Sequence, residues 1–296
     1  MQDPPEERDP REVRKQRFRR LERFRIPILP RSSGLAAGVH RSSFKGHGVE
    51  FTELREYVPG DDIRAIDWKV TARLGQPFIR LFSEERDVTI CFVVDVSGST
   101  EFGSRMSKAD LARDIAGALI LSALRHHDAV GLLLFSDQVE KYIPPRKGRH
   151  HVLGILNTLF DFCPGSRRTD IIPALHHLAG ALKRQASVVI ISDFSSPPFL
   201  WELAVLKRRH QVFAIRIADP REGEIPDIGF ITLEDSESGE QIVIDTSGEK
   251  FRDRYRELSR GSSLAIRRDL AERQVPLATV MTDGKWERDL ARFFRG

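Results

Sequence analysis

Short apolar runs separated by helical patterns dominate the chain from residue 88 onward. The run that begins at Thr89 and stops at Asp95, and the runs 129–136 and 187–192, are almost continuously aliphatic or β-branched. Such runs are typical of strands buried on both faces of a sheet. Between them apolar residues recur at helical spacing. Strands that alternate with helices predict an α/β fold, with a mostly parallel sheet and helices on both faces.

The same periodicities predict the remaining elements of this region. Ser107 and Asp110 form a capping-box pattern that starts a long, largely apolar helix. Residues near 226–246 predict an inserted β-hairpin with a Ser-Gly turn. A glycine, Gly261, predicts a break in the charged helix 250–273. The other predicted elements are strands at 139–143, 211–217 and 276–281 and helices at 149–160, 172–183, 200–209 and 285–294.

The chain before residue 88 has a different pattern and forms two further segments. Residues 1–30 are a charged arm whose apolar positions recur at helical spacing, which predicts a short amphipathic helix. Residues 31–87 form a small β-rich module, because apolar and polar positions alternate over three stretches typical of half-buried strands. These stretches are 49–54, 63–68 and 78–82. The α/β domain then occupies 88–296.

The net charge of +4 is concentrated in the arm, so it says little about what the rest of the chain binds. Residues 1–25 hold nine basic and six acidic side chains, so they carry +3 of that charge. Any electrostatic affinity for nucleic acid would therefore belong mainly to the arm. Because its apolar stripe is short, we favour a helix docked on the body over an arm that binds nucleic acid or a membrane surface. We expect no nucleic-acid partner.

Cysteines and hydropathy bear on the compartment. Cys91 lies inside an apolar run and Cys163 in a Pro/Gly loop, so neither predicts a disulfide or a nucleophile. No apolar run approaches the roughly 18 residues that a membrane-spanning helix needs, and the N-terminus lacks the apolar core of a signal peptide. These features predict a cytoplasmic protein without a transmembrane segment.

Oxygen-bearing side chains follow the first buried strand. Asp95, Ser97 and Ser99 alternate in the loop that leaves it, so one carboxylate and two hydroxyls can point to one place. Asp193 ends a second buried strand, and Thr169 precedes a helix packed beside these strands, so a parallel sheet brings both to the same edge. Hard oxygen ligands suit Mg²⁺ or Mn²⁺. The five residues are a candidate divalent-cation site.

This constellation resembles the metal-ion-dependent adhesion site of von Willebrand factor A-like domains, which have a Rossmann-like fold. The resemblance implies that the two serines and the threonine bind a divalent cation directly or through water, and that the aspartates bind the cation or its waters. It also implies an open position for an Asp or Glu carboxylate of a protein partner. Few directly bound charges would leave the cation electrophilic.

Residues 34–220 resemble a bacterial family of unknown function in which a small module precedes a von Willebrand factor A-like domain. The resemblance is carried by the stretch HRSSFKGHGVEFTELREYVPGDDIRAIDWKVTARLGQPFIRLFSEERD and the VDVSGS that follows. It implies a cytoplasmic-facing protein, commonly encoded beside a MoxR-type AAA+ ATPase, that acts with it in maturing, remodelling or metal-loading other proteins. Some members carry membrane helices that this chain lacks. Many have Met at the position of Thr100.

Four further residues are candidates for contact with the partner. Thr100 and Asp170 adjoin the candidate metal ligands, while Asp61 and Asp62 belong to a set of carboxylates in the β-rich module. That set has a competing interpretation, in which its members cap turns or pair with arginines. We favour this structural interpretation for most of them.

Catalysis is an alternative from another functional class. An Asp at the end of the first strand of an α/β sheet can accept a phosphoryl group with Mg²⁺, but that chemistry usually needs a second carboxylate where this chain has Ser97. Neither a nucleophile elbow nor a P-loop occurs. The sequence therefore predicts a non-enzymatic, metal-dependent protein-interaction module. A Mg²⁺-dependent phosphotransfer enzyme using Asp95 and a nucleic-acid-associated protein using the arm are the alternatives.

Overall fold

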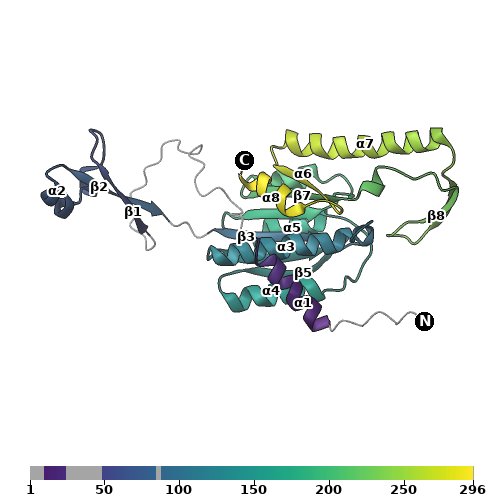
Figure 1. Ribbon diagram of the computed structural model, residues 1–296, viewed down its shortest axis with the longest axis horizontal. Coiled ribbons are helices and arrows are strands. Elements are labelled where there is room, and N and C mark those ends of the chain that lie inside the picture. Colours follow the sequence, from purple (N-terminus) through teal and green to yellow (C-terminus); the bar gives the residue numbers. More distant parts are fainter. Residues whose placement is uncertain (1–9, 25–48, 85–87, 296) are drawn as a thin grey trace, which may run out of the picture. The chain divides into compact units, whose positions relative to one another are not determined.

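The computed structural model describes residues 10–24, 49–84 and 88–295, which divide into two compact units (Figure 1). The larger unit consists of the described residues of 1–31 and 88–296, and the smaller unit of those of 32–87. The helix of the N-terminal arm therefore belongs to the same unit as the α/β domain.

A six-stranded sheet forms the centre of the larger unit. Its strands are β3 Thr89–Asp95, β4 Ala129–Phe135, β5 Val139–Arg146, β6 Ser187–Ser192, β7 Gln211–Ala218 and β10 Leu277–Met281. They lie in the order β10-β7-β6-β3-β4-β5, and all are parallel except β5, which pairs antiparallel with β4 at one edge. The predicted α/β fold with a mostly parallel sheet is confirmed.

Helices cover both faces of this sheet. Successive side chains of a buried strand point to opposite faces, so each buried strand contributes to an apolar cluster on either face. Along β3, Phe92 and Val94 belong to one apolar cluster, and Cys91 and Val93 to the other. The helices of the first cluster are α1 Pro10–Leu21, α3 Lys108–Arg125, α4 Arg149–Asp161 and α8 Trp286–Arg295. Those of the second are α5 Ile172–Ala181, α6 Leu200–Lys207 and α7 Glu249–Glu272.

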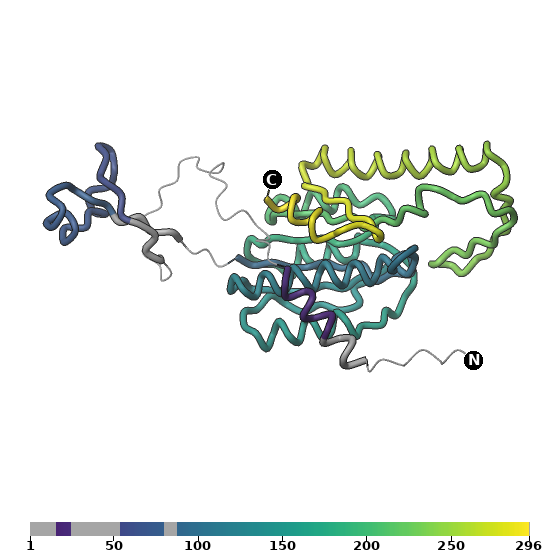
Figure 2. The backbone as a smooth tube through the Cα atoms, in the orientation of Figure 1, coloured from purple at the N-terminus to yellow at the C-terminus, as the bar shows by residue number. Residues whose placement is uncertain are grey.

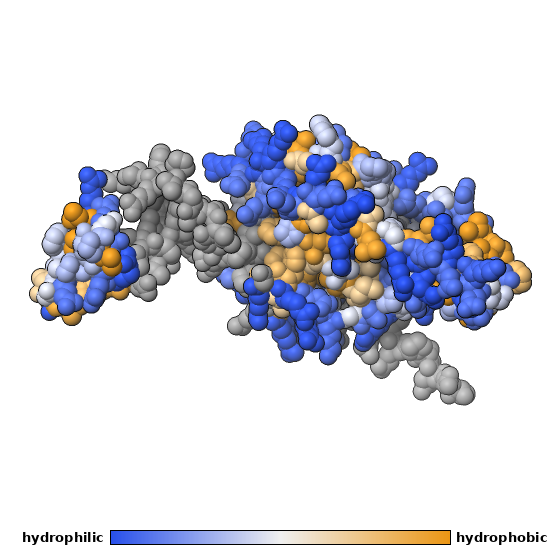
Figure 3. Space-filling model, turned by 90° about the horizontal axis from the view of Figure 1, so that it is seen from above, coloured by the Kyte–Doolittle hydropathy of each residue, from blue (hydrophilic) through white to orange (hydrophobic). Residues whose placement is uncertain are grey.

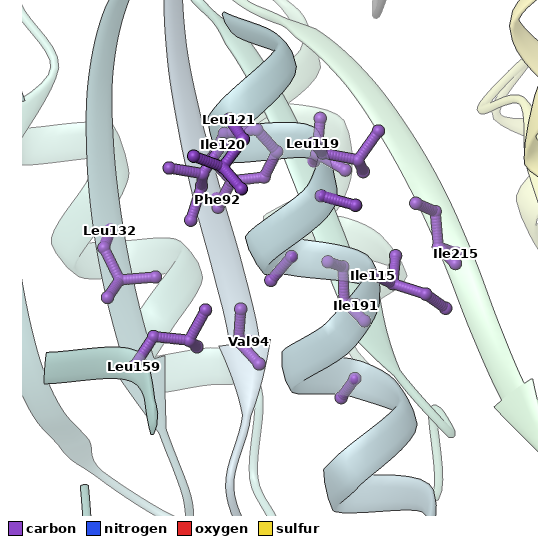
Figure 4. Packing of buried hydrophobic residues seen from close by; sticks show 14 of the residues in the cluster. Phe92, Val94, Ile115, Leu119, Ile120, Leu121, Leu132, Leu159, Ile191 and Ile215 are labelled. Carbon is purple, nitrogen blue, oxygen red and sulfur yellow. The ribbon is translucent and has the colours of Figure 1, made fainter. Parts of the chain in front are cut away.

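Most side chains of the helix α3 are buried against the sheet. Figure 4 shows its side chains, among them Ile115 and Leu119, in one continuous cluster with Phe92 and Val94 of β3. Its first turn is capped as predicted, because the Ser107 hydroxyl accepts a hydrogen bond from the Asp110 amide. The cap fixes the start of α3 at Lys108.

The order of the strands reverses at β3. The next strand in the chain, β4, lies on one side of β3, and β6 lies on the other. Ligands of open α/β sheets bind at the carboxyl ends of the strands on either side of such a reversal. The topology therefore marks the carboxyl ends of β3 and β6 as the place for a site.

The predicted hairpin is present as β8 Phe230–Glu234 and β9 Gln241–Asp245, after the short 3-10 helix η4 Pro220–Glu222. Figure 2 traces the chain from β7 through this hairpin and back along α7. The predicted break in α7 near Gly261 is wrong, because α7 is continuous through that residue. A glycine weakens a helix by about 1 kcal/mol but does not by itself end it.

The smaller unit contains an antiparallel strand pair, β1 Val49–Glu56 and β2 Phe78–Glu84. The strand predicted at 63–68 is wrong. That stretch forms the 3-10 helix η2 Ile63–Ala65 and the start of α2 Trp68–Leu74. The side chain of Asp67 accepts hydrogen bonds from two backbone amides at the start of α2, and this local cap outweighs the alternating pattern.

In the part of the chain that the structure describes, no helix combines the length and the apolar character needed to cross a membrane.

Candidate metal centre

The five residues predicted as cation ligands meet at the carboxyl edge of the sheet. Asp95 ends β3, and Ser97 and Ser99 follow it, the second of them inside the 3-10 helix η3 Gly98–Glu101. Thr169 lies in the loop before α5, and Asp193 directly follows β6. Four of the five are buried, and Ser99 is partly exposed. Within the site, solvent access is therefore greatest at Ser99.

Three hydroxyl oxygens form a chain through the site. The Ser97 and Ser99 Oγ atoms are 3.1 Å apart, and the Ser99 Oγ is 3.4 Å from the Thr169 Oγ1. Neighbouring oxygen ligands of an octahedral Mg²⁺ ion lie roughly 2.9 Å apart. The hydroxyls therefore have about the spacing that ligands of one small cation require.

Three hydrogen bonds orient the Asp95 carboxylate next to these hydroxyls. Its Oδ1 accepts hydrogen bonds from the Ser97 amide at 3.0 Å and the Ser97 hydroxyl at 2.5 Å, and its Oδ2 accepts one from the Ser192 hydroxyl at 2.6 Å. Burial, and then the negative charge of Asp193, raise the pKa of Asp95 to about 6. Two neighbouring buried carboxylates repel each other, and a bound cation would offset this repulsion.

Lys108 supplies one positive charge beside the site. Its Nζ lies 2.6 Å from the Oδ2 of Asp193 and 2.5 Å from the Oε1 of Glu222, and the lysine side chain is 3% exposed. Burial would lower the pKa of Lys108, but the two carboxylates outweigh burial and raise it. Asp193 is thereby oriented, since its Oδ1 also accepts a hydrogen bond from the Ser195 amide at 3.0 Å.

Several residues at the site have no counterpart in the sequence-based prediction. Lys108 lies in the first turn of α3, where a basic residue opposes the helix dipole, and this unusual position was an available signal. Ser192 was signalled by its place at the end of a buried strand, before Asp193. No sequence signal pointed to Glu237, whose Oε1 accepts a hydrogen bond from the Thr169 hydroxyl at 2.5 Å.

The four residues predicted to contact a partner make internal contacts. Thr100 is 3% exposed, and its hydroxyl donates to the Ser97 carbonyl. The Asp170 Oδ1 accepts from the Ile172 amide at the start of α5.

Asp61 and Asp62 belong to the smaller unit. Asp61 pairs with Arg55 at 2.9 Å and accepts a hydrogen bond from the Val58 amide, while Asp62 accepts one from the Arg64 amide. These are the turn-capping and pairing roles of the structural interpretation.

The donor set limits the kind of metal that fits. Within the described ranges, no group of three or more His, Cys, Asp or Glu side chains is arranged to hold a metal. Binding at the carboxyl edge would therefore depend on hydroxyl oxygens together with Asp95 and Asp193. Such oxygen ligands suit a hard cation.

Comparison with solved structures gives matches at low sequence identity. BatB from Bacteroides thetaiotaomicron, described as a conserved hypothetical protein, is 15% identical with a TM-score of 0.49, and the match covers 70% of this chain and 97% of that chain. Proximal thread matrix protein 1 from the mussel byssus, with a zinc-occupied MIDAS motif, is 21% identical with a TM-score of 0.37. That match covers 45% of this chain and 38% of the mussel chain.

Sequence relatives cover nearly the whole chain. Uncharacterized proteins from Mycobacterium bovis and Mycobacterium tuberculosis are each 32% identical over 279 residues, which is 92% of this chain and 87% of the relative. A family model described as "Protein of unknown function DUF58" matches residues 53–264, more than half of the chain and most of the α/β domain. The chain therefore belongs to the DUF58 family.

Proposed function

We propose that the carboxyl edge of the sheet binds a divalent cation, Mg²⁺ or Mn²⁺, and that this centre docks a carboxylate of a partner protein. The observation that carries the proposal is the meeting of Asp95, Ser97, Ser99, Thr169 and Asp193 from three separate loops. Their hydroxyls follow one another at 3.1 and 3.4 Å. A bound cation would supply a Lewis-acidic centre for a carboxylate ligand.

The side chains would have different roles in such a site. Ser97, Ser99 and Thr169 offer neutral hydroxyl oxygens. Asp95 and Asp193 supply negative charge, which the Lys108 ammonium partly offsets at Asp193. A low negative charge around a divalent cation leaves it able to attract a further carboxylate. This charge balance favours an acidic partner.

We propose a binding rather than a catalytic role. Both oxygens of Asp95 accept hydrogen bonds from Ser97 or Ser192, which holds the carboxylate in place instead of presenting it as a nucleophile. The residue two positions after Asp95, where an acid or base would be needed for phosphoryl transfer, is Ser97.

The partner that we propose is a MoxR-type AAA+ ATPase, with a role in maturing or remodelling other proteins. The support is the resemblance of residues 34–220 described above. The purified chain should retain a purified MoxR-type ATPase from the same organism in Mg²⁺ and release it in EDTA. Equal retention of the ATPase in the two buffers would contradict metal-dependent docking.

Titration calorimetry with Mn²⁺ and Mg²⁺ tests the site itself. Asp95→Asn keeps the size of the side chain and removes its charge, so we expect cation affinity to fall by at least about 10-fold. The control is Asp283→Asn, an exposed carboxylate just after β10. It should bind the cation as the wild type does. Equal affinity in the wild type and Asp95→Asn would refute the proposed function.

A further inference from the structure

We propose that Glu237, at the tip of the β8–β9 hairpin, is the chain's own carboxylate ligand for the cation site. The hairpin would then close the site from within the same chain, and a partner's carboxylate would have to displace it. This inference rests on the proposed function, because it assigns the occupant of the open position when no partner is bound.

The first observation is a direct contact inside the site. The Glu237 Oε1 accepts a hydrogen bond from the Thr169 hydroxyl at 2.5 Å, and that hydroxyl lies 3.4 Å from the Ser99 Oγ. The contact joins residues that are 68 positions apart in the chain. A carboxylate oxygen thus reaches one end of the hydroxyl chain, within hydrogen-bond distance of a candidate ligand.

The second observation is a close approach of two backbones. A Cβ atom at Gly98 would lie 2.5 Å from the Ser236 carbonyl oxygen and 3.0 Å from the Arg167 carbonyl oxygen. Only a glycine leaves room for the hairpin turn against the loop that carries Ser97 and Ser99. The hairpin tip therefore fits against the site through its backbone as well as through Glu237.

The turn itself is built to present Glu237. The Asp235 Oδ1 accepts hydrogen bonds from the Glu237 and Ser238 amides at 2.7 and 3.1 Å, and Gly239 adopts a left-handed conformation with φ of 74°. Glu237 is partly buried, whereas Glu240, at the other end of the same turn, is exposed. The two glutamates differ in their contact with the site, so one is a matched control for the other.

The hairpin can leave the site at little cost. The strands β8 and β9 pair with each other and are not part of the central sheet. Many of their side chains are exposed, including Phe230 at 77% and Val243 at 68%, and Figure 3 shows apolar surface at the end of the larger unit where the hairpin lies. A segment with few buried contacts opens with a low free energy. Displacement by a partner is therefore feasible.

Charge predicts when the hairpin docks. Without a cation, the Glu237 carboxylate would approach the carboxylates of Asp95 and Asp193 and be repelled by them. With a divalent cation bound, the same carboxylate would be attracted. Cation binding should therefore shift the hairpin toward the closed arrangement.

The experiment combines Mn²⁺ titration with amide hydrogen exchange in the full chain. In the wild type, saturating Mn²⁺ should slow exchange in the segment 229–246. In Glu237→Gln, which keeps the side-chain size, we expect this protection to be lost and Mn²⁺ affinity to fall by about 10-fold. Glu240→Gln should match the wild type in both measurements. Thermal unfolding should show that all three proteins are folded.

The outcomes separate this inference from the function on which it rests. If Glu237→Gln binds Mn²⁺ as tightly as the wild type and protects the hairpin equally, Glu237 is not a ligand, while the loss of binding in Asp95→Asn would still support the proposed function. If the wild type does not bind Mn²⁺ at all, both the proposed function and this inference are overturned.

Discussion

Asp95 contacts the hydroxyl chain of the candidate site through Ser97, and 1% of its surface is exposed. A charged carboxylate in such a place costs free energy, because burial removes water and Asp193 adds a second negative charge. Its neighbours, Ser97 and Ser192, return part of that cost through hydrogen bonds. In a cation-free protein the charge is thus a source of instability.

We therefore expect Asp95→Asn to stabilise the chain when divalent cations are removed. At pH 7.5 in EDTA, its free energy of unfolding should exceed that of the wild type by about 1–3 kcal/mol. The pKa of Asp95 in the folded protein, about 6, lies above the ordinary aspartate value of 3.8. The wild type therefore becomes less stable as the pH rises from about 4 through 6, because the buried carboxyl must lose its proton. The difference in free energy of unfolding between Asp95→Asn and the wild type should vanish near pH 4.

Urea unfolding at the two pH values measures this gap, with Asp283→Asn as the exposed control. The control should differ from the wild type by less than about 0.5 kcal/mol. An Asp95→Asn protein that is less stable than the wild type at pH 7.5 in EDTA would show that the hydrogen bonds of the carboxylate outweigh its burial.

Some residues of the candidate site can be predicted from the sequence, and others cannot. Asp95, Ser97 and Ser99 lie close together in the chain, so a local pattern predicts their meeting. Lys108 contacts Asp193 across 85 positions and Glu237 contacts Thr169 across 68. Neither contact follows from a periodicity or a motif, because each depends on where a separate element ends in space.

Two glycines show how the surroundings of an element decide the effect of one substitution. At Gly98 a new Cβ would meet two backbone carbonyl oxygens, at 2.5 and 3.0 Å, while at Gly261 in α7 nothing lies within 4 Å. The first glycine permits a contact between the hairpin and the η3 loop. The second only adds flexibility to a helix.

Gly98→Ala and Gly261→Ala should therefore have opposite effects on stability. We expect Gly98→Ala to lower the free energy of unfolding by about 1–3 kcal/mol, because the methyl group would displace the backbone at Arg167 as well as the hairpin turn, which by itself opens at low cost. Gly261→Ala should raise it by about 0.5–1 kcal/mol, because alanine is the better helix former. Thermal or urea unfolding of both variants beside the wild type measures the two shifts.

If Gly98→Ala is as stable as the wild type, the close approaches of the Arg167 loop and of the hairpin turn to Gly98 are not maintained in solution. If Gly261→Ala is destabilising, α7 is not a continuous helix at that position, and the break predicted from the sequence would be restored.

At the scale of the larger unit, the N-terminal helix α1 is part of the packed body. Leu21 is 1% exposed, and the ring of Phe24 lies 5.2 Å from that of Trp286 in α8. Arg17 pairs with Asp110 and Asp114 of α3. The docked amphipathic helix favoured from the sequence is confirmed for residues 10–24, and residues 25–30 of the predicted arm lie outside the described residues.

Removal of the Arg17 charge should weaken this attachment. Asp114 has a side chain that is 5% exposed, and its pKa is raised by burial against the lowering effect of Arg17. Arg17→Met would leave this buried carboxylate unpaired, and we expect a loss of about 2–3 kcal/mol, a value reduced because Arg17 is itself 29% exposed.

Urea unfolding compares Arg17→Met with Arg19→Met, which alters an exposed arginine of the same helix. The control should lie within about 0.5 kcal/mol of the wild type. The double variant Arg17→Met with Asp114→Leu should recover stability, since the buried carboxylate is then gone and Asp110, the other partner of Arg17, is 46% exposed. Equal stability of Arg17→Met and Arg19→Met would show that α1 is not held through Asp114.

The sequence by itself determined the order and type of most elements of the α/β domain, because buried strands and amphipathic helices carry their own periodicities. It also determined the five candidate ligands, since parallel strands present their carboxyl ends at one edge. A local cap at Asp67, which the alternating pattern does not reveal, made 63–68 a 3-10 turn and the start of a helix. Only the three-dimensional structure showed that α7 runs through Gly261 and that Lys108 and Glu237 reach the site. The physical reason is that local pattern records which face of an element is buried. The partner that meets a charged side chain depends on distances between elements that no local pattern contains.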